Sequence, residues 1–376
     1  MTTLNLTQSE LPGLKQFRAE GCLSYLIYDR ATRSAALIDP VLELMDDYRT
    51  YLADHRLKLV WALDTHTHAD HFSASQEIRN QYDVPIGMSA TTECARATHK
   101  FKHGEELQVG ELTVRVLATP GHTPDSVSYF VSGLVFTGDT LFVGGSGRTD
   151  FPGADPAQQF GSIHQVLEKL PGSTLILPGH DYNDYLFSTL EVESRKNPHW
   201  LLKDVLPFTE LKRSELVNTS HAAQEEIKKR ILFNLTSQAA SQMGSQRFGA
   251  ATACGVASKE SAQYASINVQ KYLPKLQTKA KDKDATKSQE VLFIDVREVD
   301  EFAEGHMPET RNIPLSELGL NLPELLKVRR VYVSCLSGRR SSMAAKTLSY
   351  LGVEDVVNVT GGYQAWTQAG YPVVKA

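Results

Sequence analysis

The sequence predicts two α/β domains joined by a linker, and three observations support this fold class. With 376 residues, the chain exceeds the usual size of a single domain. Strand-like apolar runs alternate with helical stretches, once over residues 23–177 and again over residues 291–369. Between these regions, residues 279–290 are polar and charged without large apolar side chains, a composition typical of a solvated linker.

The first domain combines strand-like runs with fewer helical patterns. The expected strands are residues 23–28, 35–39, 58–63, 112–118, 127–131, 134–137 and 174–177. Helical patterns cover residues 73–82 and 156–170, and Ser132-Gly133 predicts a hairpin turn. From about residue 198 the pattern is helical, and we assign it to the first domain as a C-terminal extension that ends at residue 277.

The second domain is smaller and repeats the alternation of strand and helix. Its expected strands are residues 291–295, 331–334 and 356–359, and its expected helices are residues 341–351 and 363–369. The predicted organisation is therefore a domain at residues 1–277, a linker at residues 278–290 and a domain at residues 291–376.

Composition and charge exclude several classes of protein. The apolar fraction of 41% and the charged fraction of 22% are those of an ordinary globular chain. No apolar run approaches the roughly 20 residues of a membrane-spanning helix, and a net charge of -5 gives no reason to expect nucleic acid as a partner. The first ten residues lack the pattern of a secretory signal, and the four scattered cysteines contain no Cys-x-x-Cys pair. We therefore expect a cytoplasmic protein that binds neither membrane nor nucleic acid.

A dense group of imidazoles predicts a metal site in the first domain. Directly after the strand at residues 58–63, three histidines and one aspartate fall within six positions: His66, His68, Asp70 and His71. Three further candidate ligands each follow a strand-like run: His122, Asp139 and His180. A surface loop has no structural use for so many imidazoles, whereas a metal ion does.

These residues, in this order, resemble the H-x-H-x-D-H motif and later ligands of the metallo-β-lactamase superfamily. The resemblance covers about residues 15–200 and implies an αβ/βα sandwich with the metal at the edge of two facing sheets. It also suggests a homo-oligomer. It does not define the reaction, because members of one fold perform different chemistry.

Two metal assemblies are compatible with the sequence. In the first, two zinc ions are held by all seven residues with Asp139 as the bridge, which would resemble glyoxalase II, a thioester hydrolase. In the second, one Fe(II) per chain is held by His66, His122 and Asp139, a two-histidine, one-carboxylate set that leaves positions for other ligands.

Two stretches favour the single iron. Residues 138–151 end in Gly-Arg-Thr-Asp-Phe and closely resemble persulfide dioxygenases, as does Gly-His-Asp-Tyr at residues 179–182. By that resemblance, Arg148 contacts the glutathione carboxylate and Tyr182 lines the substrate pocket. The other four candidate ligands would then orient the iron ligands and water by hydrogen bonds: His68, Asp70, His71 and His180.

A second reactive motif lies in the C-terminal domain. Cys335 follows a strand, and the loop after it carries Gly338, Arg339 and Arg340 before a helix begins. Loop amides, a helix N-terminus and cationic side chains lower a thiol pKa and bind anions. The spacing from Cys335 to Arg340 is one residue shorter than in the C-x5-R loop of protein tyrosine phosphatases.

The shorter loop resembles that of rhodaneses. Further matching residues are Asp295-Val-Arg297, Glu301-Phe302, Gly305-His306 and residues 358–362. The resemblance implies that Cys335 carries sulfane sulfur as a persulfide, while Arg339, Arg340 and the loop amides hold the anionic donor. Asp295 and Arg297 are expected to brace the domain.

Together the two resemblances imply one function. The first domain would oxidise glutathione persulfide, or another low-molecular-weight thiol persulfide, with O₂ to sulfite. The second would move sulfane sulfur between thiosulfate, sulfite and thiols. The alternative is a dinuclear zinc thioester hydrolase fused to a sulfur carrier. Cys254, within a Gly/Ala-rich stretch, is a candidate for a redox or sulfur-shuttle role.

Overall fold

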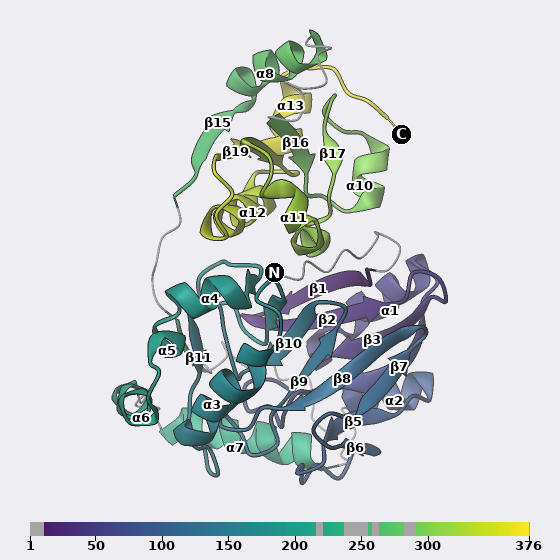
Figure 1. Cartoon of the computed structure of the whole chain (residues 1–376). Coiled ribbons are helices and arrows are strands. Elements are labelled where there is room, and N and C mark those ends of the chain that lie inside the picture. Colours follow the sequence, from purple (N-terminus) through teal and green to yellow (C-terminus); the bar gives the residue numbers. More distant parts are fainter. Residues whose placement is uncertain (1–10, 216–220, 237–254, 258–262, 282–290, 376) are drawn as a thin grey trace. The chain divides into compact units, whose positions relative to one another are not determined.

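The structure is a computed structural model that describes residues 11–215, 221–236, 255–257, 263–281 and 291–375. The chain forms two compact units, residues 1–183 with 188–259 and residues 184–187 with 260–376 (Figure 1). Within the described ranges, no helix combines the length and the apolar character needed to cross a membrane.

The first sheet of the first unit begins with antiparallel strands and continues with parallel ones. In spatial order its strands are β1 (Gly13–Ala19), β2 (Cys22–Tyr28), β3 (Ser34–Ile38), β4 (Lys58–Leu63), β5 (Ile86–Ser89) and β6 (His99–Phe101). Strands β2 and β3 are almost wholly buried, which explains why their sequences are continuous apolar runs.

The second sheet is largely antiparallel, with one parallel pair between β10 and β12. In spatial order its strands are β13 (Ser188–Thr189), β12 (Leu175–Pro178), β10 (Leu134–Gly138), β9 (Val127–Val131), β8 (Leu112–Ala118) and β7 (Glu106–Val109). The predicted turn between β9 and β10 is confirmed: Ser132 and Gly133 both have positive φ, at 46° and 79°.

The two sheets face each other and carry helices on their outer sides (Figure 1). Across the interface, the Tyr25 ring contacts Phe136, and the Tyr129 hydroxyl donates to the Asp64 carbonyl. The helices of this unit are α1 (Met45–Asp54), α2 (Ser75–Tyr82), α3 (Pro156–Gly161), α4 (Leu190–Lys196), α5 (Pro198–Leu201), α6 (Val205–Ser214) and α7 (His221–Leu235). Two short strands, β11 (Gly145–Gly147) and β14 (Gly255–Ala257), form a separate antiparallel pair.

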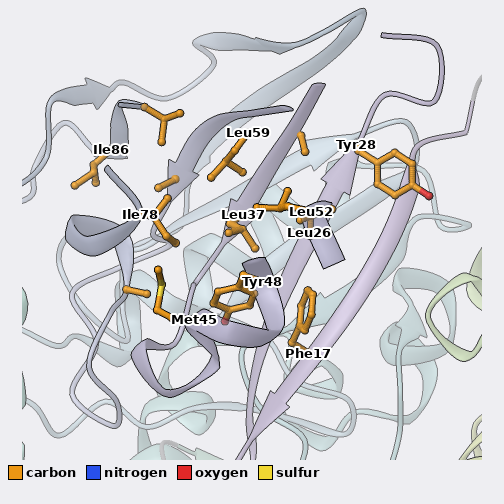
Figure 2. Packing of buried hydrophobic residues seen from close by; sticks show 14 of the residues in the cluster. Phe17, Leu26, Tyr28, Leu37, Met45, Tyr48, Leu52, Leu59, Ile78 and Ile86 are labelled. Atoms are coloured by element: carbon orange, nitrogen blue, oxygen red, sulfur yellow. The ribbon is translucent and has the colours of Figure 1, made fainter. Parts of the chain in front are cut away.

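Each outer helical layer has its own hydrophobic core. Beside the first sheet, Met45 and Tyr48 of α1 and Ile78 of α2 pack with Leu37 and Leu59 of the strands (Figure 2). The equivalent cluster beside the second sheet includes Leu117, Val135, Ile176, Ile163, Trp200 and Phe208. These two cores confirm the predicted αβ/βα sandwich.

The second unit has a parallel sheet, which confirms the predicted class of the C-terminal domain. In spatial order its strands are β15 (Ala265–Asn268), β19 (Val356–Thr360), β18 (Arg330–Ser334), β16 (Val291–Asp295) and β17 (Arg311–Asn312). The accompanying helices are α8 (Val269–Lys281), α10 (Val299–Glu304), α11 (Leu322–Leu325), α12 (Arg339–Tyr350) and α13 (Gly362–Gln368).

The structure places the boundary between the units earlier in the chain than the sequence pattern suggested. Residues 265–281, which we assigned to the first domain and the start of the linker, belong to the second unit. Strand β15 pairs in parallel with β19, and Tyr272 of α8 packs against Phe293 and Trp366. A four-residue edge strand gives little sequence signal, so the polar stretch after α8 was the more visible feature.

Candidate metal centre and sulfurtransferase loop

All seven candidate metal ligands lie in loops that follow the C-terminal ends of strands in the sandwich. The loop after β4 carries the H-x-H-x-D-H motif, and single ligands follow β8, β10 and β12. The pairing of β10 with β12 puts Gly138 beside Pro178, one residue before Asp139 and two residues before His180. The fold therefore brings together residues that are more than 110 positions apart in sequence, from His66 to His180.

His66, His122 and Asp139 form a buried group whose ligand atoms lie within 4.8 Å of one another. Asp139 Oδ2 is 3.5 Å from His122 Nε2 and 4.0 Å from His66 Nε2. Among the described residues, His66 Nε2 and both Asp139 carboxylate oxygens find no hydrogen-bond partner although they are buried. Unsatisfied buried polar atoms are costly, and a cation at this point would satisfy His66 Nε2 and a carboxylate oxygen of Asp139. Two imidazoles and one carboxylate are also a suitable donor set for iron or zinc.

A backbone contact fixes the ring of His122 in a form that could bind a metal. Its Nδ1 lies 2.7 Å from the carbonyl oxygen of Arg148. Because a carbonyl only accepts, Nδ1 must carry the proton, and Nε2 then has a free lone pair directed toward Asp139. Burial lowers the pKa of His122 to about 4, so the ring is neutral near neutral pH. The imidazole is thus held in the tautomer and charge state that a metal ligand needs.

Asp70 is the centre of a hydrogen-bonded group next to these three residues. Its Oδ2 lies 3.0 Å from Cys22 Sγ, 3.0 Å from His71 Nδ1 and 3.1 Å from His180 Nε2. Although burial alone would raise it, the neighbouring His71 and His180 hold the pKa of Asp70 well below its usual range. His180 Nε2 also lies 3.4 Å from Asp139 Oδ2. This pattern suits residues that orient a metal ligand.

His68 faces a different carboxylate. Its Nε2 lies 3.1 Å from Asp39 Oδ1, and Asp39 also accepts from the Thr65 backbone amide at 2.6 Å. Burial lowers the pKa of His68 to about 4 and raises that of Asp39 to about 6. Asp39 was not identified from the sequence. This residue directly follows β3, which runs parallel to β4 and ends beside the start of the histidine loop, so its position could have indicated it.

The residues expected to bind substrate lie beside the metal group. The Arg148 guanidinium forms a two-point ion pair with Asp150 and lies 4.7 Å from the centre of the Phe151 ring. Tyr182 is partly exposed and stacks on His180 with 5.5 Å between ring centres. Asp150 therefore occupies the fork of Arg148 that we expected a substrate carboxylate to occupy. Cys254, the candidate redox residue, lies outside the described residues.

In the second unit, the loop after β18 surrounds the buried thiol of Cys335. The Gly338 amide lies 3.1 Å from Cys335 Sγ and the Ser341 hydroxyl lies 3.4 Å from it, while Arg339 is exposed. Arg340 forms two hydrogen bonds of 2.6 and 2.7 Å to Glu301. The Gly338 amide directed at the sulfur could support a negative charge there, but the charge of Arg340 is already partly neutralised by Glu301.

Asp295 and Arg297 brace this unit from within. Arg297 Nε donates to both Asp295 oxygens, at 3.1 and 2.9 Å, and its Nη atoms donate to the Glu301 and Gly305 carbonyls. Both side chains are almost fully buried, so this pair links β16 to α10 rather than contacting a substrate.

Comparison with known proteins agrees with this geometry. Residues 18–180 match the model of the metallo-beta-lactamase superfamily, and residues 276–369 match the rhodanese-like domain. Over 191 residues the chain is 35% identical to the mitochondrial persulfide dioxygenase ETHE1 of Homo sapiens, an alignment that covers 50% of this chain and 75% of that protein. The chain belongs to the persulfide dioxygenase family.

Two solved structures are also similar to this persulfide dioxygenase family member. The structure of ETHE1 from Myxococcus xanthus has 37% identity and a TM-score of 0.56, and the match covers 59% of this chain and 99% of that one. A metallo-beta-lactamase structure from Staphylococcus aureus matches 94% of this chain and 99% of its own, with 23% identity and a TM-score of 0.55. That likeness shows the fold alone. The rhodanese-like match begins at residue 276, inside α8.

Proposed function

We propose that the first unit oxidises glutathione persulfide, or a similar low-molecular-weight thiol persulfide, with O₂ at one Fe(II) per chain. In balanced form, glutathione persulfide, O₂ and water give glutathione, sulfite and two protons. The observation that carries the proposal is the buried group of His66, His122 and Asp139 in a chain of the persulfide dioxygenase family. Among the described residues, His66 Nε2 and both Asp139 oxygens of this group have no hydrogen-bond partner.

His66, His122 and Asp139 would hold the iron, which would supply coordination sites for the persulfide sulfur and for O₂. The protein's own contribution is to orient and to exclude water. Arg148 O maintains the His122 tautomer, and the group around Asp70 limits the rotation of His180 beside Asp139. Burial of all three proposed ligands keeps the site apart from bulk solvent.

Arg148 is the residue that we propose for substrate binding. A substrate carboxylate would exchange with Asp150 in the guanidinium fork, while Phe151 keeps the guanidinium plane in place. Tyr182, stacked on His180, would line the side of the same pocket. Such an exchange makes binding dependent on a carboxylate in the thiol carrier.

We propose that the second unit transfers sulfane sulfur through Cys335. The Cys335 thiolate attacks the outer sulfur of thiosulfate, the sulfur–sulfur bond breaks, and sulfite leaves with the electron pair. The resulting Cys335 persulfide then passes its sulfur to a thiolate, which regenerates Cys335. The amide of Gly338 supports the negative charge on the sulfur in both steps.

A dinuclear zinc thioester hydrolase is the second candidate, and one observation favours it. Asp70 Oδ1 and His71 Nε2 are also buried and have no hydrogen-bond partner among the described residues, which would suit ligands of a second metal. Against this, Cys22 Sγ and His71 Nδ1 both lie 3.0 Å from Asp70 Oδ2, so His71 turns Nδ1 rather than Nε2 toward that carboxylate.

Metal content and substrate together separate the two candidates. The protein would be purified without oxygen, its metals quantified, and its turnover measured with glutathione persulfide and with S-lactoylglutathione. One iron per chain and turnover of the persulfide alone would support the dioxygenase. Two zinc ions per chain with thioester hydrolysis in the absence of oxygen would establish the hydrolase instead.

A further inference from the structure

The side chain of Asn234 spans the loop that carries the H-x-H-x-D-H motif. Asn234 lies in the last turn of α7 and is 2% exposed. Its amide nitrogen donates to the carbonyl oxygens of His68 at 2.9 Å and His71 at 2.8 Å. Its amide oxygen accepts from the Ser73 backbone amide at 2.9 Å. Both amide hydrogens and the amide oxygen of Asn234 are therefore bonded to the backbone of one loop. Because the carbonyls of His68 and His71 can only accept, they define which end of the amide is the nitrogen.

The backbone of Asn234 is fixed from the opposite side. Its carbonyl oxygen accepts from Arg96 Nη2 at 2.7 Å and lies 3.0 Å from Cys94 Sγ. Arg96 is buried, and its guanidinium lies 5.6 Å from the centre of the Phe233 ring. The end of α7 is thus anchored to residues 94–96, so the amide of Asn234 holds the loop at a fixed place rather than moving with it.

We propose that Asn234 is a positioning residue of the metal centre, which acts by fixing the backbone of residues 68–73. This inference rests on the proposed metal site. The contacts of Asn234 with this loop are to backbone atoms of His68, His71 and Ser73. They set the backbone of a segment that carries Asp70 and His71 and begins two residues after His66. Metal ligands must be held to within a fraction of an ångström, and loss of a supporting contact typically weakens metal binding by about 10- to 100-fold. The inference also gives α7, in the helical extension, a specific role.

The test measures metal binding without turnover. Co²⁺ binding would be determined for the metal-free full chain by competition with a chelator and by the visible absorption of the bound ion. We expect Asn234→Ala to weaken Co²⁺ binding by roughly 10- to 100-fold. Asn234→Asp should weaken it further, because its carboxylate would face two carbonyl oxygens. Asn80→Ala, at an exposed asparagine of α2, is the matched control and should leave the affinity unchanged.

Two results would overturn the inference: Co²⁺ affinity within twofold of the wild type in folded Asn234→Ala, or an equal loss in Asn80→Ala. If Asn234→Ala is insoluble, Asn234→Ser, which keeps one donor and one acceptor, is measured by the same titration under the same criterion. Because no substrate is present, absence of oxygen uptake by the wild type would contradict the proposed function and leave the result on Asn234 standing.

Discussion

His122 donates a hydrogen bond of 2.7 Å from Nδ1 to the carbonyl oxygen of Arg148. One residue therefore serves two parts of the site through different atoms. The Arg148 backbone orients a proposed metal ligand, and its side chain is the group proposed to bind substrate. Gly147, directly before it, donates from its amide to the Asp139 carbonyl at 3.0 Å, so the same short segment also supports the proposed carboxylate ligand.

Replacement of the Arg148 side chain should separate these two roles. In Arg148→Ala the carbonyl remains, so we expect unchanged iron content, whereas the KM for glutathione persulfide should rise by roughly 10- to 100-fold with the loss of a charge-assisted hydrogen bond. Steady-state kinetics and metal analysis on the same preparation check both. Arg49→Ala, at an exposed ion pair of α1, serves as the control. Loss of iron together with substrate affinity would refute the division of roles.

A buried lysine supports the segment that contains Arg148. Lys212 Nζ lies 3.1 Å from Glu215 and 3.3 Å from Ser146 Oγ, and its side chain is 1% exposed. His199 joins the same group, 2.7 Å from Ser146 Oγ and 2.8 Å from Glu215. We expect Lys212→Met to lower the free energy of unfolding of the first unit by about 3–5 kcal/mol, because it leaves a poorly solvated carboxylate with one partner fewer.

Urea unfolding, followed by a signal from the first unit, measures this effect. Lys203→Met removes an exposed lysine paired with Glu168 at 3.2 Å and should cost less than about 1 kcal/mol. An equal loss of unfolding free energy in the two variants would mean that the buried ion pair of Lys212 stabilises the first unit no more than an exposed pair does.

In the second unit, the Arg340–Glu301 pair should limit thiosulfate binding. The hydrogen bonds from Arg340 hold the pKa of Glu301 below its ordinary value of 4.5, so the pair is intact above that pH and is lost as the pH falls through the lowered value. Glu301→Gln removes this competing charge, and we expect a several-fold lower KM for thiosulfate near neutral pH. Glu324→Gln, which breaks the exposed pair with Arg311, is the control. An unchanged or higher KM in Glu301→Gln would show that Arg340 acts with Glu301 rather than against it.

The sequence predicted best the strands that are at least five residues long and rich in apolar side chains. The expected strands at residues 58–63, 112–118, 127–131 and 291–295 have the bounds found in the structure. Strand β1 escaped prediction because polar residues interrupt its apolar ones, and β5, β6 and β13 are too short to show a pattern. The helix expected at residues 156–170 is helical almost throughout but changes from α to π geometry at Ser162 and to 3₁₀ geometry at Leu167.

The candidate site was predictable where chemistry is concentrated in one stretch of sequence. Histidine spacing and the Gly-Arg-Thr-Asp-Phe stretch pointed to residues that the fold does bring together. Partners that reach the site from elsewhere left no such signal: Asn234 bonds to a carbonyl 166 positions earlier, and Cys22 lies 48 positions from Asp70. Local sequence also could not indicate that Asp150 would occupy the fork of Arg148, because that depends on side-chain placement.

Oxygen consumption tests the central claim most directly. An oxygen electrode would record uptake by the anaerobically purified, iron-quantified chain after addition of glutathione persulfide, with sulfite measured in the same sample. The account predicts one sulfite formed per O₂ consumed, and no uptake by His122→Ala, which lacks a proposed iron ligand. An iron-loaded wild-type chain that consumed no oxygen, or His122→Ala with unchanged uptake, would contradict it.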